Sequence, residues 1–270
     1  MTARGAGGGG TGGPAAHSPM LARLAGERAT GVLLRDTGAL YLDRGAVVHA
    51  ESPAAPGIEV LLTAGGRIGP EAWQEAVAEA GAECAVGRRL VERGRIAAGE
   101  LEIGRLGALH DAAWFVLAPA AGPTRFRHGV RHWFGSPGGG VPVAAVEGEV
   151  SRRRRLLERL WPHPELDTAP VTPAPAARAA GARPPYLPRG QAAVLGLADG
   201  VRTPSAIAAL LGRPAFHALV DVRRLAALGL VETPPAGSGQ PGRAPAWVQS
   251  IGDTPDAALL RRLLVALERL

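Results

Sequence analysis

The feature that most constrains this chain is a proline-rich stretch at residues 162–188. Eight prolines fall within it, together with several Ala and Arg residues. Proline fixes φ and lacks a backbone N–H, so neither a long helix nor a central strand is expected to run through such a stretch. We therefore predict an extended linker over residues 161–187. The chain has 270 residues, enough for two modest domains on either side of that linker.

Before the linker, the first pattern is a series of short apolar runs. The runs lie at residues 32–34, 40–42 and 46–50, and the turns between them end at Gly38 and Gly45. Glycine can adopt the positive φ that tight hairpins require. This pattern predicts a three-stranded β-meander.

Residues 57–121 follow with helical spacing of apolar positions. Pro70 opens one of the expected helices, on which Trp73 and Val77 share a face. The sequence Gly-Arg-Ile occurs at 66–68 and again at 94–96, and we interpret the two copies as similar helix starts rather than as a repeat architecture. One or two strands near residues 126–134 and an amphipathic helix over 146–160 then complete a domain spanning 19–160.

After the linker, residues 188–252 have the order helix, helix, helix, strand, loop, strand. Thr203 is the expected N-cap of the second helix, the third helix runs from about Pro214 to Leu228, and Gly229 ends it. This order predicts a winged-helix domain whose wing is the loop 234–245. The fold class expected for the whole chain is therefore α+β.

The two ends of the chain carry different patterns. Residues 1–18 are rich in Gly and have little to bury, so we expect a disordered tail. Residues 253–270 place leucines on one side of an amphipathic helix. Such a helix could pair with a partner or with a second copy of the chain to form a homodimer.

Charge and cysteine content narrow the class of protein. All 30 basic residues are Arg, as expected from the codon bias of a GC-rich genome, and the net charge is +6. A basic balance permits anionic partners, including nucleic acid, without requiring them. Cys84 is the only cysteine, which excludes an intramolecular disulfide. The N-terminus lacks the apolar core of a signal peptide, and the most apolar stretch (112–121) is too short to cross a bilayer, so we expect a cytoplasmic protein with no membrane contact.

Catalytic and metal-binding motifs are not found in the sequence. It contains no serine elbow, paired-carboxylate motif or phosphate loop, so we expect no enzymatic activity and no cofactor. His128 and His132 have the spacing of a helical metal pair, but a third ligand is missing and Gly129 disfavours a helix there, so no metal site is predicted. His49 is expected to pack or to bond to backbone, or, in a sensor, to face a small-molecule pocket. The run Arg152–Arg155 is interpreted as a solvated helix face.

Part of the chain resembles a known family. The pattern of three strands followed by helices is similar to the PATAN domain, the N-terminal module of PatA-like bacterial regulators, and the resemblance lies in Thr30–Leu33, Gly38–Leu42 and Gly45–Glu51. Residues 86–101 also resemble helical segments of that family and of the N-terminal domains of type II secretion ATPases. The resemblance covers roughly residues 18–160 and implies an α/β sensor or adaptor module without a catalytic group. Residues 187–233 are similar to the helical domain that often follows it, whereas the receiver domain of PatA-like proteins is missing.

Two functions are compatible with these observations. In the first, the protein is a bacterial transcriptional regulator whose N-terminal module senses a signal and whose winged helix binds duplex DNA. The residues expected to contact DNA are Arg213, His217, Arg223, Arg224 and, in the wing, Arg243. In the second, the protein is an adaptor that contacts other proteins, for example in small-GTPase or two-component-like signalling, without DNA. Ala215, Ala218 and Asp221 make the third helix poor in donors for base edges, which counts against DNA binding. The sequence nevertheless predicts the DNA-binding regulator first and the adaptor as the alternative.

Overall fold

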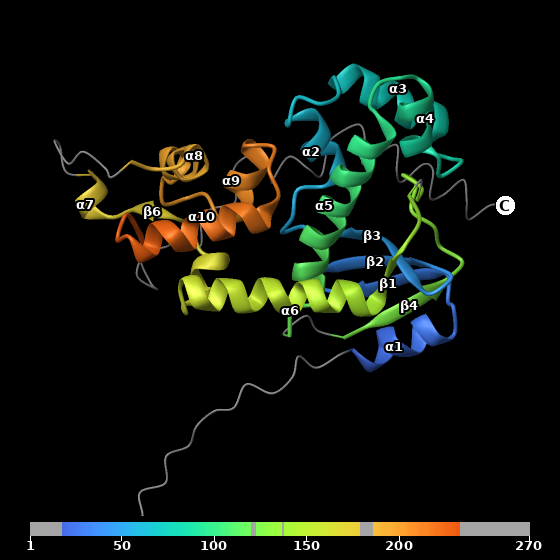
Figure 1. Ribbon diagram of the computed structural model, residues 1–270, viewed down its shortest axis with the longest axis horizontal. Coiled ribbons are helices and arrows are strands. Elements are labelled where there is room, and N and C mark those ends of the chain that lie inside the picture. Colours follow the sequence, from blue (N-terminus) through green and yellow to red (C-terminus); the bar gives the residue numbers. More distant parts are fainter. Residues whose placement is uncertain (1–17, 120–122, 137, 179–185, 233–270) are drawn as a thin grey trace, which may run out of the picture. The chain divides into compact units, whose positions relative to one another are not determined.

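The computed structural model describes residues 18–119, 123–136, 138–178 and 186–232 (Figure 1). Among these residues, one five-stranded antiparallel sheet combines with helices into an α+β fold, which confirms the expected class. Residues 1–17 of the predicted tail (1–18), the wing with its returning strand, and the C-terminal helix over 253–270 lie outside the described residues. The winged helix therefore stays a prediction.

The predicted β-meander is confirmed. Its strands are β1 (Gly31–Arg35), β2 (Gly38–Asp43) and β3 (Ala46–Glu51), and they pair in chain order. Gly38 and Gly45 have φ values of 139° and 81°, in the region that glycine adopts without strain. Between β2 and β3 the register shifts at the Tyr41–Leu42 step, so Val48 is an extra residue on β3, a β-bulge.

Two short strands complete the sheet at its edges. β4 (Arg125–His128) pairs with β1, and β5 (Val141–Pro142) pairs with β3 at Ala46 and Val47. The strand order is β4-β1-β2-β3-β5. The first core forms where the sheet meets α1 (Pro19–Gly26), α5 (Ala98–Val116) and α6 (Val143–Leu160), and its buried members include Leu33, Leu40, Val47, Leu109, Ala113 and Val146.

A second core lies among the helices predicted between residues 57 and 121. These are α2 (Ile58–Thr63), α3 (Pro70–Ala80), α4 (Val86–Glu92) and the first half of α5. Gly66 and Gly94 both have positive φ, at 71° and 65°, and the isoleucine that follows each Gly-Arg pair is buried. The two Gly-Arg-Ile segments thus serve the same local purpose, which is to turn the chain and anchor the next helix with an apolar side chain.

Arg105 is a buried cation at the junction of α5 and the sheet. Its side chain is 1% exposed, and its Nη1 donates a hydrogen bond to the carbonyl of Val48 in the bulge of β3. The remaining N–H groups bond to the Glu102 carboxylate at 2.8 and 2.6 Å and to the carbonyl of Gly139 at 3.0 Å. Full pairing is what allows a charge to stay in such a place.

The segment predicted to be an extended linker is largely folded. It contains the 3₁₀ helix η1 (Pro164–Asp167), strand β6 (Thr172–Pro173) and helix α7 (Pro175–Arg178), and it buries Leu166 and Val171 in a third core. Pro164 and Pro175 are the first residues of helices, where the backbone N–H has no partner within the helix and its absence costs no hydrogen bond. These prolines are therefore compatible with short helices in this segment.

Three helices follow, as predicted. They are α8 (Arg189–Leu197), α9 (Pro204–Leu210) and α10 (Ala215–Ala227). Thr203 caps α9 by accepting the N–H of Ala206 at 3.3 Å, and Gly229 follows α10 with φ 67°. The strand after α10, β7 (Val231–Glu232), pairs with β6 from the supposed linker.

The described residues all fall within one compact unit. In particular, α10 packs against both α6 and the end of α5, and this fourth core contains Phe115, Leu157, Phe216 and Leu219. Within the described ranges, no helix has both the length and the apolar character that a bilayer-spanning helix needs.

Candidate functional site

The third helix of the C-terminal part, α10, carries most of the residues predicted to contact DNA. Arg223 is 3% exposed. Its Nε and Nη2 donate to the two carboxylate oxygens of Asp167 at 2.9 and 2.6 Å, and its Nη1 donates to the carbonyls of Leu157 and Trp161. The expectation that Arg223 points outward is therefore wrong. On a helix, position 223 shares a face with Phe216 and Leu219, which are buried.

The other predicted contacts are divided between paired and exposed positions. Arg213 is half-buried and donates from Nη2 to Asp221 at 3.0 Å. His217 and Arg224 are exposed on α10, and Arg243 lies outside the described residues. The structure thus leaves two of the four described candidates available to a duplex.

A buried carboxylate from α5 covers the beginning of α10. Asp111 is 0% exposed, and its two oxygens accept the backbone N–H groups of Ala215 at 2.6 Å and Phe216 at 2.8 Å. The first N–H groups of a helix have no partner within the helix, and a carboxylate at this end also interacts favourably with the helix dipole. Pro214, the N-cap position of α10, makes no side-chain cap bond, so Asp111 takes that role from a distant part of the chain.

Arg153 of α6 lies beside this carboxylate. Its Nη1 is 3.7 Å from Asp111 Oδ1, its Nε donates to Glu149 at 2.7 Å, and its guanidinium carbon is 4.5 Å from the centre of the Phe216 ring. The run Arg152–Arg155 is therefore not wholly solvated, because Arg153 is only 12% exposed. Hydrogen bonds from Arg152 and Arg153 lower the pKa of Glu149 to about 2, with the bond from Arg152 as the largest cause.

A second polar cluster lies on the sheet. His49 of β3 and His132 are 2% and 3% exposed, and their rings stack with centroids 3.7 Å apart and planes 20° apart. His132 Nε2 is 2.9 Å from Glu51 Oε1, and the hydroxyl of Tyr41 is 3.2 Å from Glu51 Oε2. The sequence could have predicted that His49 and Glu51 share one face of the sheet, because they are two positions apart on the same strand. It contains no local pattern that predicts their contact with His132.

These side chains are the right kinds for a metal site, and hydrogen bonds join them. The backbone N–H of Phe134 donates to His132 Nδ1 at 3.2 Å, which leaves Nε2 of that ring to donate to Glu51. One ligand atom each from His49, Glu51 and His132 lies within 4.8 Å of the other two. Imidazole and carboxylate are ligands of divalent transition metals, so these three residues are a candidate metal-binding group.

Burial keeps His49 neutral. Desolvation, with the nearby His132 and Arg105 acting in the same direction, lowers the pKa of His49 to about 3. Its Nδ1 is buried and finds no hydrogen-bond partner among the described residues. The pKa of Tyr41 is raised to about 12 by burial and by the Glu51 carboxylate.

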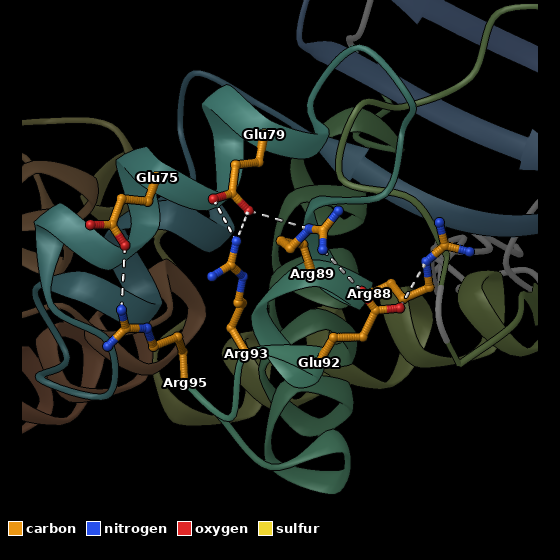
Figure 2. Close-up of polar contacts among 7 residues, drawn as sticks. All are labelled: Glu75, Glu79, Arg88, Arg89, Glu92, Arg93 and Arg95. Atoms are coloured by element: carbon orange, nitrogen blue, oxygen red, sulfur yellow. Dashed lines mark hydrogen bonds and ion pairs between the residues drawn. The ribbon is translucent and has the colours of Figure 1, made fainter.

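The most extensive ion-pair network connects α3 with α4 and the loop before α5 (Figure 2). Both oxygens of Glu79 accept from Arg93, at 2.8 and 3.0 Å, and Glu79 also lies 3.4 Å from Arg89. Arg95 pairs with Glu75 at 3.3 Å, beside them on the same surface. Exposed pairs of this kind contribute about 0–1 kcal/mol each. Because the cations are paired with carboxylates, this surface does not present them to an anionic ligand.

No family model, curated protein or solved structure matches the chain.

Proposed function

We propose that this protein is a non-enzymatic bacterial regulatory adaptor that works in the cytoplasm through protein contacts rather than by reading DNA. The observation that carries the proposal is the burial of the N-terminal turn of α10, where Asp111 occupies the N–H groups of Ala215 and Phe216. A recognition helix places the residues of its N-terminal end in the major groove. In this protein that end is packed against α5.

The exposed side of α10 also favours a protein partner. His217, Arg224 and Leu228 are exposed along this side, which we call the α10 stripe, and the half-buried Val220 between them packs against the fourth core. Leu228 is 55% exposed. A stripe that offers a single arginine suits a protein surface better than a phosphate backbone, which calls for several cations.

The resemblance of the β-meander and its helices to PATAN modules supports the same proposal. Such modules belong to regulators, and the confirmed meander with helices packed on it is compatible with that likeness. The adaptor would present the meander side or the α10 stripe to a signalling protein, such as a component of a small-GTPase or two-component-like system.

A titration of the full chain with duplex DNA tests the proposal. At physiological salt we expect every duplex to bind more weakly than about 1 μM, the range of non-specific electrostatic binding. Fluorescence anisotropy with several promoter fragments, each with a scrambled control of the same length, provides the measurement. Nanomolar binding that distinguishes a promoter fragment from its scrambled control would contradict the adaptor.

The second candidate is the DNA-binding regulator. It is favoured by the succession α8, α9, α10 and β7 and by the exposure of His217 and Arg224. If this candidate is right, Arg224→Ala weakens binding to all duplexes and reduces the dependence on salt by about one phosphate contact. Under the adaptor proposal the same substitution leaves the weak binding nearly unchanged.

A further inference from the structure

The surface between α10 and the helices α5 and α6 differs from the other cores in its composition. Its buried members include Ala215 and Ala218 of α10, and its large buried apolar side chains are Phe115, Leu157, Phe216 and Leu219, with Trp114 and Leu156 packed against them. Small side chains bury little apolar area, and the hydrophobic contribution of a contact is roughly proportional to that area. The apolar contribution to the packing of α10 on α5 is therefore smaller than that of the sheet core.

This surface also holds polar atoms that have no hydrogen-bond partner. Trp114 Nε1 and Arg153 Nη1 are buried without a hydrogen bond, and they are two of six such side-chain atoms in the described part of the chain. Trp114 lies on α5 and packs against the α10 core, and Arg153 Nη1 lies 3.7 Å from Asp111 Oδ1. Permanent interiors satisfy nearly all such groups, and each exception calls for an explanation.

The polar connection between α5 and the beginning of α10 is itself costly. The Asp111 carboxylate is fully buried, and its partners are two backbone N–H groups and one guanidinium nitrogen at 3.7 Å. Burial raises the pKa of Asp111 despite these interactions, so desolvation of the charge outweighs them. A contact with few large apolar side chains, unpaired polar atoms and a destabilised charge has the properties of a surface that separates.

We infer that the docking of α10 on α5 is a reversible latch, in which Asp111 holds the N-terminal turn of α10 and its release uncovers Ala215, Phe216 and Arg153. This inference goes beyond the proposed function, because the latch is a property of this chain alone. Opening would return the two helix N–H groups and the unbonded Trp114 Nε1 to water, and it would leave the five-stranded sheet intact.

Amide hydrogen exchange on the full chain tests the latch. In the unmodified protein we expect the amides of Ala215 and Phe216 to exchange at least about tenfold faster than the slowest amides of β2, because they open in a smaller event than global unfolding. If both groups exchange at the same rate, α10 separates only when the whole unit unfolds, and the latch is refuted.

The variant Asp111→Asn tests the role of the carboxylate. Loss of a charge-assisted bond to a helix N–H is expected to speed exchange at Ala215 and Phe216 by about tenfold or more, with the amides of β2 unchanged. The matched control is Glu100→Gln, an exposed carboxylate on the same helix, which should change neither group. Equal acceleration at β2 would show that Asp111 supports the whole fold and would overturn the inference.

A second variant acts from the other side of the contact. Ala215→Pro removes one of the two N–H groups that Asp111 accepts, at the first helical position, where proline is well tolerated. We expect faster exchange at Phe216 and His217 and a preserved α10. If neither variant changes exchange at the start of α10, the latch is refuted while the adaptor proposal is untouched. If Asp111→Asn opens α10 and also creates selective nanomolar DNA binding, the latch stands and the adaptor proposal fails.

Discussion

At the scale of single residues, His49 connects the stability of the fold to pH. Its pKa is about 3 in the folded protein, below the usual value of 6.5, because the ring is buried beside His132 and Arg105. The unfolded chain therefore binds a proton that the folded protein does not bind between these two values. The free energy of unfolding should be fully retained above pH 6.5 and should fall as the pH drops from 6.5 towards 3.

Replacement of this ring should flatten that dependence. The side chain of His49→Leu cannot titrate. Between pH 6.5 and pH 4.5 we therefore expect the free energy of unfolding of this variant to decrease by about 2 kcal/mol less than that of the unmodified protein. Urea unfolding followed by circular dichroism at a series of pH values gives the measurement. His128→Gln, at an exposed position, serves as the control. Identical slopes in His49→Leu and the unmodified chain would contradict the assignment.

At the scale of elements, α10 shows which contacts helical spacing predicts and which it does not. Arg223 lies seven residues after Phe216 and four after Leu219, so helical spacing alone predicts that it shares their buried face. Its partner Asp167 was not predictable in the same way, because it lies in a stretch whose prolines suggested an extended chain. Proline at the first residue of a short helix and proline in a linker look alike in a sequence.

The ion pair between Arg223 and Asp167 should be strongly coupled. Arg223→Met leaves the buried Asp167 carboxylate without its partner, and we expect a loss of about 3–5 kcal/mol in the free energy of unfolding. The double variant Arg223→Met, Asp167→Leu should lose clearly less, since no uncompensated charge remains. Arg224→Met, one position along and exposed, should stay within about 0.5 kcal/mol of the unmodified chain. Additive losses in the double variant would show that the pair is not coupled.

At the scale of the whole molecule, the supposed linker and the C-terminal helices share one core. Leu166 and Val171 pack with Val194, Val222 and Leu225 of the helices. A fragment of residues 188–233 lacks Leu166, Val171 and Asp167. We expect this fragment to melt without a cooperative transition, whereas a fragment of residues 161–233 should retain more helix and a sharper transition. Circular dichroism during heating measures both, and equal cooperativity would contradict this view of the core.

The sequence could predict the elements that depend on local patterns, but it could not predict the contacts between residues far apart in the chain. The meander, the helices between 57 and 121 and the three C-terminal helices follow from local spacing and turn residues. The candidate site does not, because Asp111 meets Ala215 more than one hundred positions away and His132 meets Glu51 at a separation of 81. A single sequence carries no local pattern for such pairs, since each residue taken alone is ordinary for its element.

Arg105 has a consequence for encounters between copies of this chain. An open sheet edge exposes N–H and C=O groups on which a foreign strand can grow. Here β5 covers the first part of β3, the bulge bends the strand at Val48, and the guanidinium of Arg105 occupies the carbonyl that the bulge sets free. Replacement of Arg105 would leave this carbonyl free to accept from a foreign strand, so we expect a variant without the guanidinium to be less soluble at high concentration than the unmodified chain.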